Sequence, residues 1–236
     1  MSRVQPERGV SRPRTAIYLC LALLLVFPLC STGIEQSVGA LALHIGEIGA
    51  RILTESAVWL LAALILVIGV VCEPRSLASI GLRRPTKWTP LLGFAVAVAL
   101  VALGGAASFV TYNVLRAPNH TPAQVEQLVR GSFVYAMFLA LRAGVVEELL
   151  YRGLAIEQLT ELTGNRSLAA LIATSAFVAV HLVHFDVRQL IPVATVAFGL
   201  TAVYLWKRNL WINIFAHVLI DALALGAVAL RATDLY

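Results

Sequence analysis

The chain has 236 residues, of which 59% are hydrophobic and only 13% are charged. Soluble domains carry about 25% charged residues, so this composition excludes an ordinary soluble domain and indicates an integral membrane protein. The net charge of +5 does not require nucleic acid, because the lysine and arginine residues are explained by membrane topology, and no aromatic-and-basic surface stretch argues for a nucleic-acid interface.

Apolar runs close to the roughly 20 residues needed to cross a bilayer follow one another along the chain. They lie at 15–34, 56–72, 91–112, 132–150, 167–184, 189–206 and 210–230. Segment 37–53 would add a short interfacial or re-entrant helix. The sequence therefore predicts an all-α, polytopic bundle of about seven to eight transmembrane helices. We expect a tail at 1–14 followed by one membrane domain at 15–236, since no internal repeat or long linker divides it.

Lysine and arginine gather in alternate connections of the chain. They fill the N-terminal tail, the connection at 74–90 and the turn at 207–208, whereas the connections between these are nearly balanced in charge. Short loops rich in lysine and arginine stay in the cytosol, so we expect the N-terminus there. The first apolar run could instead be a cleaved signal peptide ending near Ser31, but it is long for that role and an uncleaved span is preferred.

Two adjacent carboxylates and a guanidinium, Glu147, Glu148 and Arg152, lie in the apolar run at 132–150 or directly after it. Ionisable groups at membrane depth indicate a functional site. On an α-helix Glu148 and Arg152 share a face at i,i+4, while the neighbouring Glu147 projects in another direction. We therefore expect Glu148 to be a supporting, ion-paired residue and Glu147 to be the free carboxylate that acts as a base.

Two later spans also carry polar groups. His181 follows Phe177 by four residues, and His217 precedes Asp221 by four residues. At this spacing His217 and Asp221 share a helix face, and a carboxylate beside an imidazole can fix its tautomer. Each histidine alone could be a helix-packing residue. A free glutamate, two histidines and an aspartate on three helices are harder to explain as packing, because membrane helices usually associate through small residues.

The depths of these residues predict that they can meet. Glu147 lies about 16 residues before the turn at Gly164-Asn165 and His181 about 16 after it, so both lie roughly 24 Å from that turn. His217 lies about 12 Å beyond the turn at 207–209. If the first turn protrudes further into the cytosol, the three side chains converge a short way below the cytosolic surface.

The order EExxxR, FxxxH and HxxxD on successive spans resembles the CAAX-protease and bacteriocin-processing family, also called the Abi family of type II CAAX prenyl endopeptidases. The resemblance covers about 130–225, the expected catalytic core. It implies an intramembrane endopeptidase, and it favours the membrane of a bacterial or archaeal cell. The family's prenyl-processing members carry Asn where this chain has Asp221.

The residues then allow a concrete mechanism. Glu147 would be the general base, His181 would hold the attacking water, and His217 with Asp221 would stabilise the oxyanion. No cofactor is favoured. A zinc-dependent version remains open, in which Glu147, His181 and His217 form a His₂Glu ligand set.

Two alternatives are not enzymes. Relatives of the family include bacteriocin-immunity proteins, so a non-catalytic immunity or scaffold protein is the main one. A transporter is the weaker one, since transporters are commonly built from inverted repeats. We expect membrane lipids and a peptide or membrane-associated protein substrate as partners, and no nucleic acid. The sequence does not set the oligomeric state, or say whether the substrate is prenylated.

Overall fold

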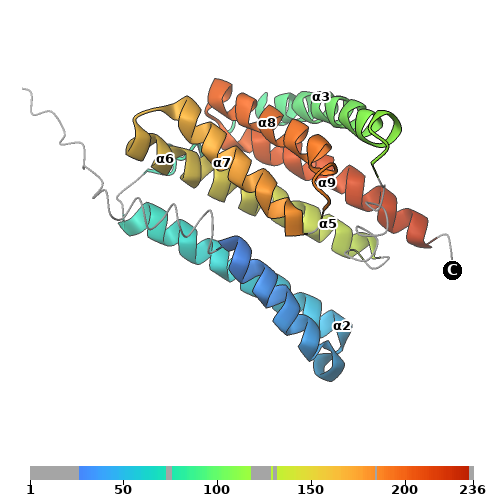
Figure 1. The fold of residues 1–236 in the computed structure, drawn as a ribbon. Coiled ribbons are helices and arrows are strands. Elements are labelled where there is room, and N and C mark those ends of the chain that lie inside the picture. The colour runs from blue at the N-terminus through green and yellow to red at the C-terminus, as the bar shows by residue number, and fades with distance from the viewer. Residues whose placement is uncertain (1–26, 73–75, 118–128, 130–131, 184, 234–236) are drawn as a thin grey trace, which may run out of the picture.

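The computed structural model describes residues 27–72, 76–117, 129, 132–183 and 185–233 (Figure 1). The tail predicted at 1–14, the signal-peptide alternative up to residue 26 and the start of the span predicted at 15–34 lie outside the described residues. Over the described ranges the chain is helical between its turns, which confirms the predicted all-α class. Five helices are long and apolar enough to cross a membrane: His44–Val71, Thr89–Val114, Arg166–Val183, Leu190–Lys207 and Leu210–Arg231.

The first described helix, α2 (Phe27–Val67), is broken only once, at Gly46, where φ is 73° and ψ is 162°. The two arms of α2 lie side by side in Figure 1. The predicted separate helix at 37–53 is therefore wrong, since Gly46 divides that segment and each half joins a longer arm. Glycine lacks the Cβ that disfavours positive φ, so it allows this reversal where the apolar pattern gives no signal.

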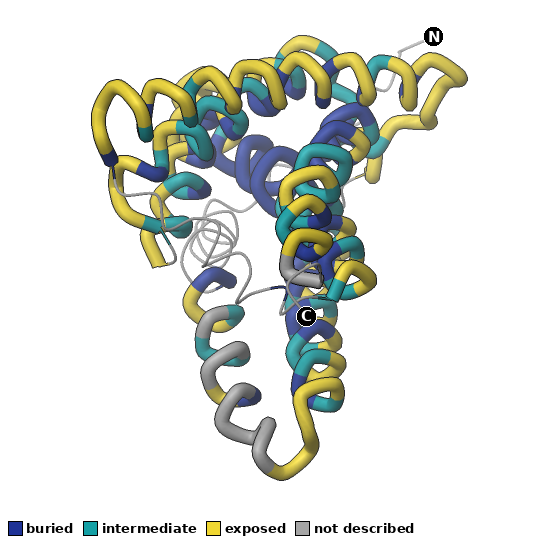
Figure 2. Tube along the Cα trace, turned by 90° about the vertical axis from the view of Figure 1, so that its right-hand side faces the viewer, coloured by how far each residue is buried: buried dark blue, intermediate teal, exposed yellow. Residues whose placement is uncertain are grey.

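The remaining helices form the body of the protein. They are η2 (Ile68–Cys72), α3 (Thr89–Phe109), η3 (Val110–Val114), α5 (Phe133–Arg142), η4 (Ala143–Ala155), α6 (Ile156–Thr163), α7 (Arg166–Val180), η5 (His181–Val183), α8 (Leu190–Lys207) and α9 (Leu210–Thr233). Helix α9 packs against α3, α5 and η4, and α7 packs against α6, η4 and α8. Figure 2 shows the buried positions where helices meet and exposed positions on the outer faces. Many exposed residues are large and apolar, as lipid-facing surfaces are, and the chain is an integral membrane protein.

The span predicted at 132–150 is part of a longer helical run. The elements α5, η4 and α6 continue without a break from Phe133 to Thr163. The run begins at Ser132, whose hydroxyl accepts a hydrogen bond from the Tyr135 amide at 3.3 Å, and it ends at Gly164 in the left-handed conformation. This run is not among the five apolar candidates, and it carries four charged residues between 142 and 152.

Three connections meet at one end of the bundle. The carbonyl of Gly81 accepts a hydrogen bond from the Leu210 amide at 2.8 Å, which joins the basic connection after η2 to the turn between α8 and α9. At the same end Glu157 of α6 accepts hydrogen bonds from Arg166 and Arg208. The bond to Glu157 raises the pKa of the Arg208 guanidinium, which therefore stays charged. The two basic connections predicted to share a side thus lie together.

Helices η4 and α9 approach each other closely at Gly144. A Cβ on this glycine would lie 2.7 Å from the Val218 nitrogen and 3.0 Å from its Cα, both backbone atoms of α9. Backbone atoms cannot move aside as a flexible side chain can. Gly144 therefore sets the spacing that brings the glutamates of η4 beside His217.

Gly144→Ala should lower the free energy of unfolding by about 1–3 kcal/mol, the usual penalty for overpacking. The measurement is the thermal unfolding of purified protein in lipid nanodiscs. Gly105→Ala in α3 is the matched control, because a Cβ there meets nothing within 4 Å. Equal unfolding temperatures for the two variants would contradict a close contact between η4 and α9.

Candidate active site

The centre of the site is the carboxylate of Glu148, which is wholly buried. Its Oε1 accepts a hydrogen bond from Arg152 Nη1 at 2.9 Å, and the Arg152 side chain is only 1% exposed. The structure thus places this pair as the i,i+4 spacing predicts. A buried charge needs a partner of opposite sign and further hydrogen bonds, and both are present.

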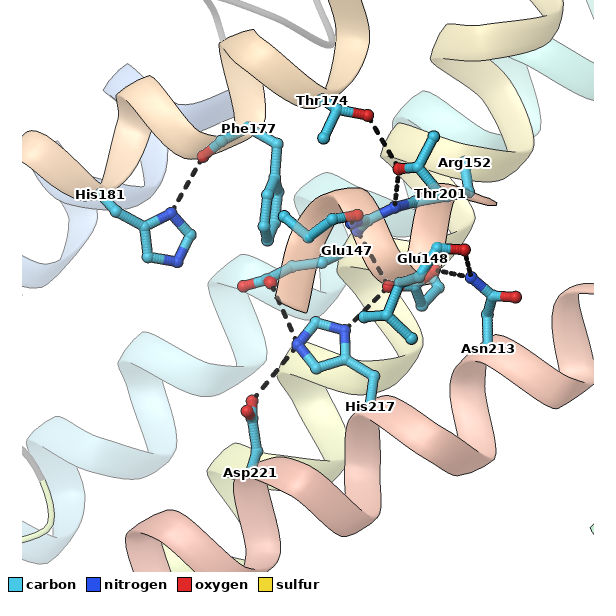
Figure 3. A network of polar contacts seen from close by, with 12 residues as sticks. Glu147, Glu148, Arg152, Thr174, Phe177, His181, Thr201, Asn213, His217 and Asp221 are labelled. Atoms are coloured by element: carbon cyan, nitrogen blue, oxygen red, sulfur yellow. Dashed lines mark hydrogen bonds and ion pairs between the residues drawn. The ribbon is translucent and has the colours of Figure 1, made fainter. Parts of the chain in front are cut away.

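His217 of α9 lies between three carboxylates (Figure 3). Its Nδ1 is 2.9 Å from Glu148 Oε1, while its Nε2 is 3.5 Å from Asp221 Oδ2 and 3.8 Å from Glu147 Oε2. An ionised carboxylate only accepts hydrogen bonds, so Nδ1 carries a hydrogen that it donates to Glu148. Nε2 is then the ring nitrogen that faces Glu147 and Asp221.

Both glutamates contact the ring of His217, but at opposite nitrogens: Glu148 at Nδ1 and Glu147 at Nε2. Glu147 therefore has a partner on another helix, α9, which the sequence analysis did not name. Both glutamates lie on η4, which is a π-helix over Ala143–Ala155 and not the α-helix that the spacing argument assumed. The two carboxylates still differ in environment: the side chain of Glu147 is 23% exposed and that of Glu148 is 0% exposed.

Arg152 is held by groups that the sequence analysis missed. Its Nη2 donates to the Ala197 carbonyl at 3.1 Å, and its Nε donates to the Thr201 hydroxyl at 3.4 Å. Thr201 in turn bonds to Thr174 of α7 at 2.8 Å. Threonines are common in membrane helices, so these two carry no signal in the sequence on their own. Their positions relative to Arg152 depend on how α7, α8 and η4 pack against one another, which the sequence pattern does not give.

Asn213 is the second missed group. It lies one turn before His217 on α9, it is fully buried, and its Nδ2 donates to Glu148 Oε2 at 3.2 Å. The spacing NxxxHxxxD was a usable signal, since it puts three polar side chains on one face of an apolar helix.

His181 directly follows the C-terminal end of α7, and Figure 3 shows its ring apart from the ion-paired residues around Glu148. Its Nδ1 bonds to the Phe177 carbonyl at 2.9 Å, and since a carbonyl only accepts, Nδ1 is the donor. In the neutral ring Nε2 is then an acceptor. Phe177 links His181 to the centre, because its ring contacts the His181 ring edge-on and lies 4.6 Å from the Arg152 guanidinium carbon. In Figure 3 the Glu147 carboxylate points toward the side where His181 lies.

The zinc alternative can be compared with this geometry. Among the described residues, no three His, Cys, Asp or Glu side chains are grouped so that they could hold a metal ion. Glu147, His181 and His217 are therefore not gathered as a ready His₂Glu set in this arrangement. The bond from His217 Nδ1 to Glu148 does not itself argue against zinc, because metal-binding histidines usually donate their other nitrogen to a carboxylate. Zinc dependence stays a prediction.

The region that contains these residues matches a known family. Residues 129–223 match the family model described as type II CAAX prenyl endopeptidase Rce1-like. The resemblance predicted from the three motifs is thereby confirmed, and the matched region holds every residue of the site.

One curated relative shares a longer stretch with the chain. It is "Putative membrane peptidase YdiL" of Bacillus subtilis (strain 168), 22% identical over 131 residues. The match covers 56% of this chain and 52% of the relative, so the chain spans about half the length of that protein. No solved structure matches the chain.

Glu148→Gln should lower the free energy of unfolding by about 3–5 kcal/mol, because it leaves the buried Arg152 without a counter-charge. Glu147→Gln is the matched control: it removes a neighbouring charge that is partly exposed and not paired with Arg152, so stability should change little. Thermal unfolding of both variants in nanodiscs measures the difference. If the two variants were equally stable, the different roles of the two glutamates would be refuted.

Proposed function

We propose that this protein is an intramembrane endopeptidase in which Glu147 activates a water molecule to hydrolyse a peptide bond. The observation that carries the proposal is the pairing of Glu147 with His217 Nε2 at 3.8 Å, while Glu148 holds the other nitrogen of the same ring. One carboxylate is buried and fully bonded, and the other is partly exposed. The family match to prenyl endopeptidases supports a peptide substrate.

The reaction uses only side chains of this chain. Glu147 takes a proton from water as the oxygen attacks the scissile carbonyl carbon. His181 accepts a hydrogen bond from the same water through Nε2, because its Nδ1–H is engaged by Phe177. The oxyanion that forms is stabilised by the doubly protonated, positively charged ring of His217, which donates through Nε2–H while its Nδ1–H stays on Glu148. The Asp221 carboxylate beside Nε2 favours this charged ring and holds it in place. Glu147 then returns the proton to the amine, and the C–N bond breaks.

We infer that the site opens to the cytosol. His217 is seven residues from the start of α9 at Leu210, a rise of about 10 Å. The turn before Leu210 is bonded to the basic connection at Gly81. Since basic connections favour the cytosol, the N-terminus is cytosolic and the site lies a short way below the cytosolic surface. From the family resemblance we further propose that the host membrane is that of a bacterial or archaeal cell, and that the substrate is a prenylated protein or a leader peptide.

Glu147→Gln should abolish proteolysis, a loss of about 10²–10⁴-fold or more expected for removing a general base. Comparative peptidomics of membranes that contain the wild type or the variant should find cleavage products only with the wild type. Glu47→Gln is the matched control, because its carboxylate is 66% exposed on α2. Unchanged peptides with all three proteins would favour the non-catalytic immunity or scaffold alternative.

Metal removal separates glutamate chemistry from zinc chemistry. Purified protein should contain less than one zinc per chain and should keep its activity after exhaustive chelation and dialysis. Added zinc should not stimulate it and could inhibit by binding the carboxylates. Stoichiometric zinc that is lost and regained together with activity would decide for the metallopeptidase.

The side on which the site opens can be tested by labelling. In a cysteine-free background, Arg84→Cys should react with a membrane-impermeant maleimide only from the cytosolic side, and Asn113→Cys only from outside. Both side chains are exposed in the structure. A cysteine that fails to react with the maleimide from one side would therefore be shielded by the membrane and not buried inside the protein. Labelling of Asn113→Cys from the cytosol alone would reverse the proposed topology.

A further inference from the structure

Asn213 has no role in the reaction described above, yet it is bonded to the centre of the site. Its Nδ2 donates to Glu148 Oε2 at 3.2 Å and to the Leu200 carbonyl of α8 at 2.8 Å. Both hydrogens of the amide group are therefore used. Its Oδ1 is buried and has no hydrogen-bond partner within the described part of the chain. The residue is thus used for its two donors.

The two oxygens of Glu148 have different partners. Oε1 accepts from Arg152 Nη1 and His217 Nδ1, each at 2.9 Å, and Oε2 accepts from Asn213. A carboxylate rotates easily about its last side-chain bond, because that torsion is broad and roughly two-fold. The bond to Oε2 opposes this rotation, so it holds Oε1 at the position where it meets the histidine.

Asn213 and His217 stand four residues apart on α9, on the same helix face. Glu148 therefore bridges two successive turns of α9, with one oxygen on each. The plane of the carboxylate is then fixed relative to α9 itself, and with it the direction of the Nδ1–H bond. The opposite nitrogen, Nε2, is in turn aimed at Glu147 and Asp221.

We propose that Asn213 is a positioning residue that orients the Glu148 carboxylate and, through it, the ring of His217. The consequence for peptide hydrolysis rests on the proposed function, whereas the orientation of the ring does not. A packing role is the competing explanation, because the bond from Asn213 to Leu200 also joins α9 to α8.

The test is the ¹⁵N NMR spectrum of histidine in the full chain, labelled and placed in lipid nanodiscs. The chain has 5 histidines, and the signal of His217 is identified by its loss in His217→Gln. Asn213→Asp keeps the shape of the side chain but replaces the donor with an acceptor. Asn213→Leu removes the polar group, and Asn213→Ser keeps one shorter donor. Gln158→Leu is the matched control, since Gln158 is another fully buried amide, ten residues beyond Glu148.

In the wild type the His217 spectrum should show a hydrogen-bonded proton on Nδ1. The Asp and Leu variants should shift or broaden that signal, the Ser variant less so, and Gln158→Leu should leave it unchanged. With a cleavable peptide, the Asp and Leu variants should lose about 10- to 100-fold in kcat with little change in KM, the effect usual for partners that orient a functional histidine.

The proposal would be overturned if the Asn213 variants were less stable than the wild type but gave the same His217 spectrum. Asn213 would then serve only in packing. Failure of all three variants to fold would overturn the proposal in the same way. If the spectrum responds to Asn213 but the wild type cleaves no peptide, the positioning role stands and the endopeptidase function fails.

Discussion

A carboxylate with no exposure to solvent, that of Glu148, dictates how the centre of this protein is built. Removing such a charge from water carries a penalty of several kcal/mol, which only close partners of good geometry can offset. The partners come from the same helix, through Arg152, and from α9, through Asn213 and His217. Arg152 must in turn be satisfied by α8. The charge therefore holds η4, α8 and α9 in one arrangement.

The two adjacent glutamates differ in their environment and in the nitrogen of His217 that each contacts. Both carboxylate oxygens of Glu148 accept hydrogen bonds. Glu148 is therefore suited to hold Arg152 and His217 in place, and not to exchange protons with a substrate. Glu147 contacts the same histidine more loosely and is partly exposed. Both glutamates belong to the π-helix η4. π-Helical turns occur frequently at functional sites, and here the element carries both carboxylates.

Local signals in the sequence predicted the parts of the site that lie within one helix. The pairs Glu148 with Arg152 and His217 with Asp221 follow from i,i+4 spacing, and the structure brings both together. Contacts between helices were harder to predict. The role of Thr201 depends on how α8 packs against η4, and a single hydroxyl in an apolar span has no pattern.

The fold was predictable to a similar degree. Apolar runs indicated a helical membrane bundle, and five described helices meet the requirements for a span. The sequence analysis misplaced the break in α2 because hydropathy carries no information about backbone conformation. Gly46 is also one of several glycines in that segment, so its identity alone did not mark the break. The π-helix was missed because the spacing argument assumes α-helical geometry. Both errors arise where the backbone departs from the standard helix.

The central claim is that Glu147 acts on water and does not itself attack the peptide. A single turnover in ¹⁸O-labelled water tests it most directly, with purified protein in lipid vesicles and a peptide whose cleavage depends on Glu147. The account predicts that the first product already carries ¹⁸O in its new carboxylate, because the oxygen comes from the solvent. An unlabelled first product would mean that an enzyme carboxylate supplied the oxygen through a covalent intermediate, and that result would contradict the account.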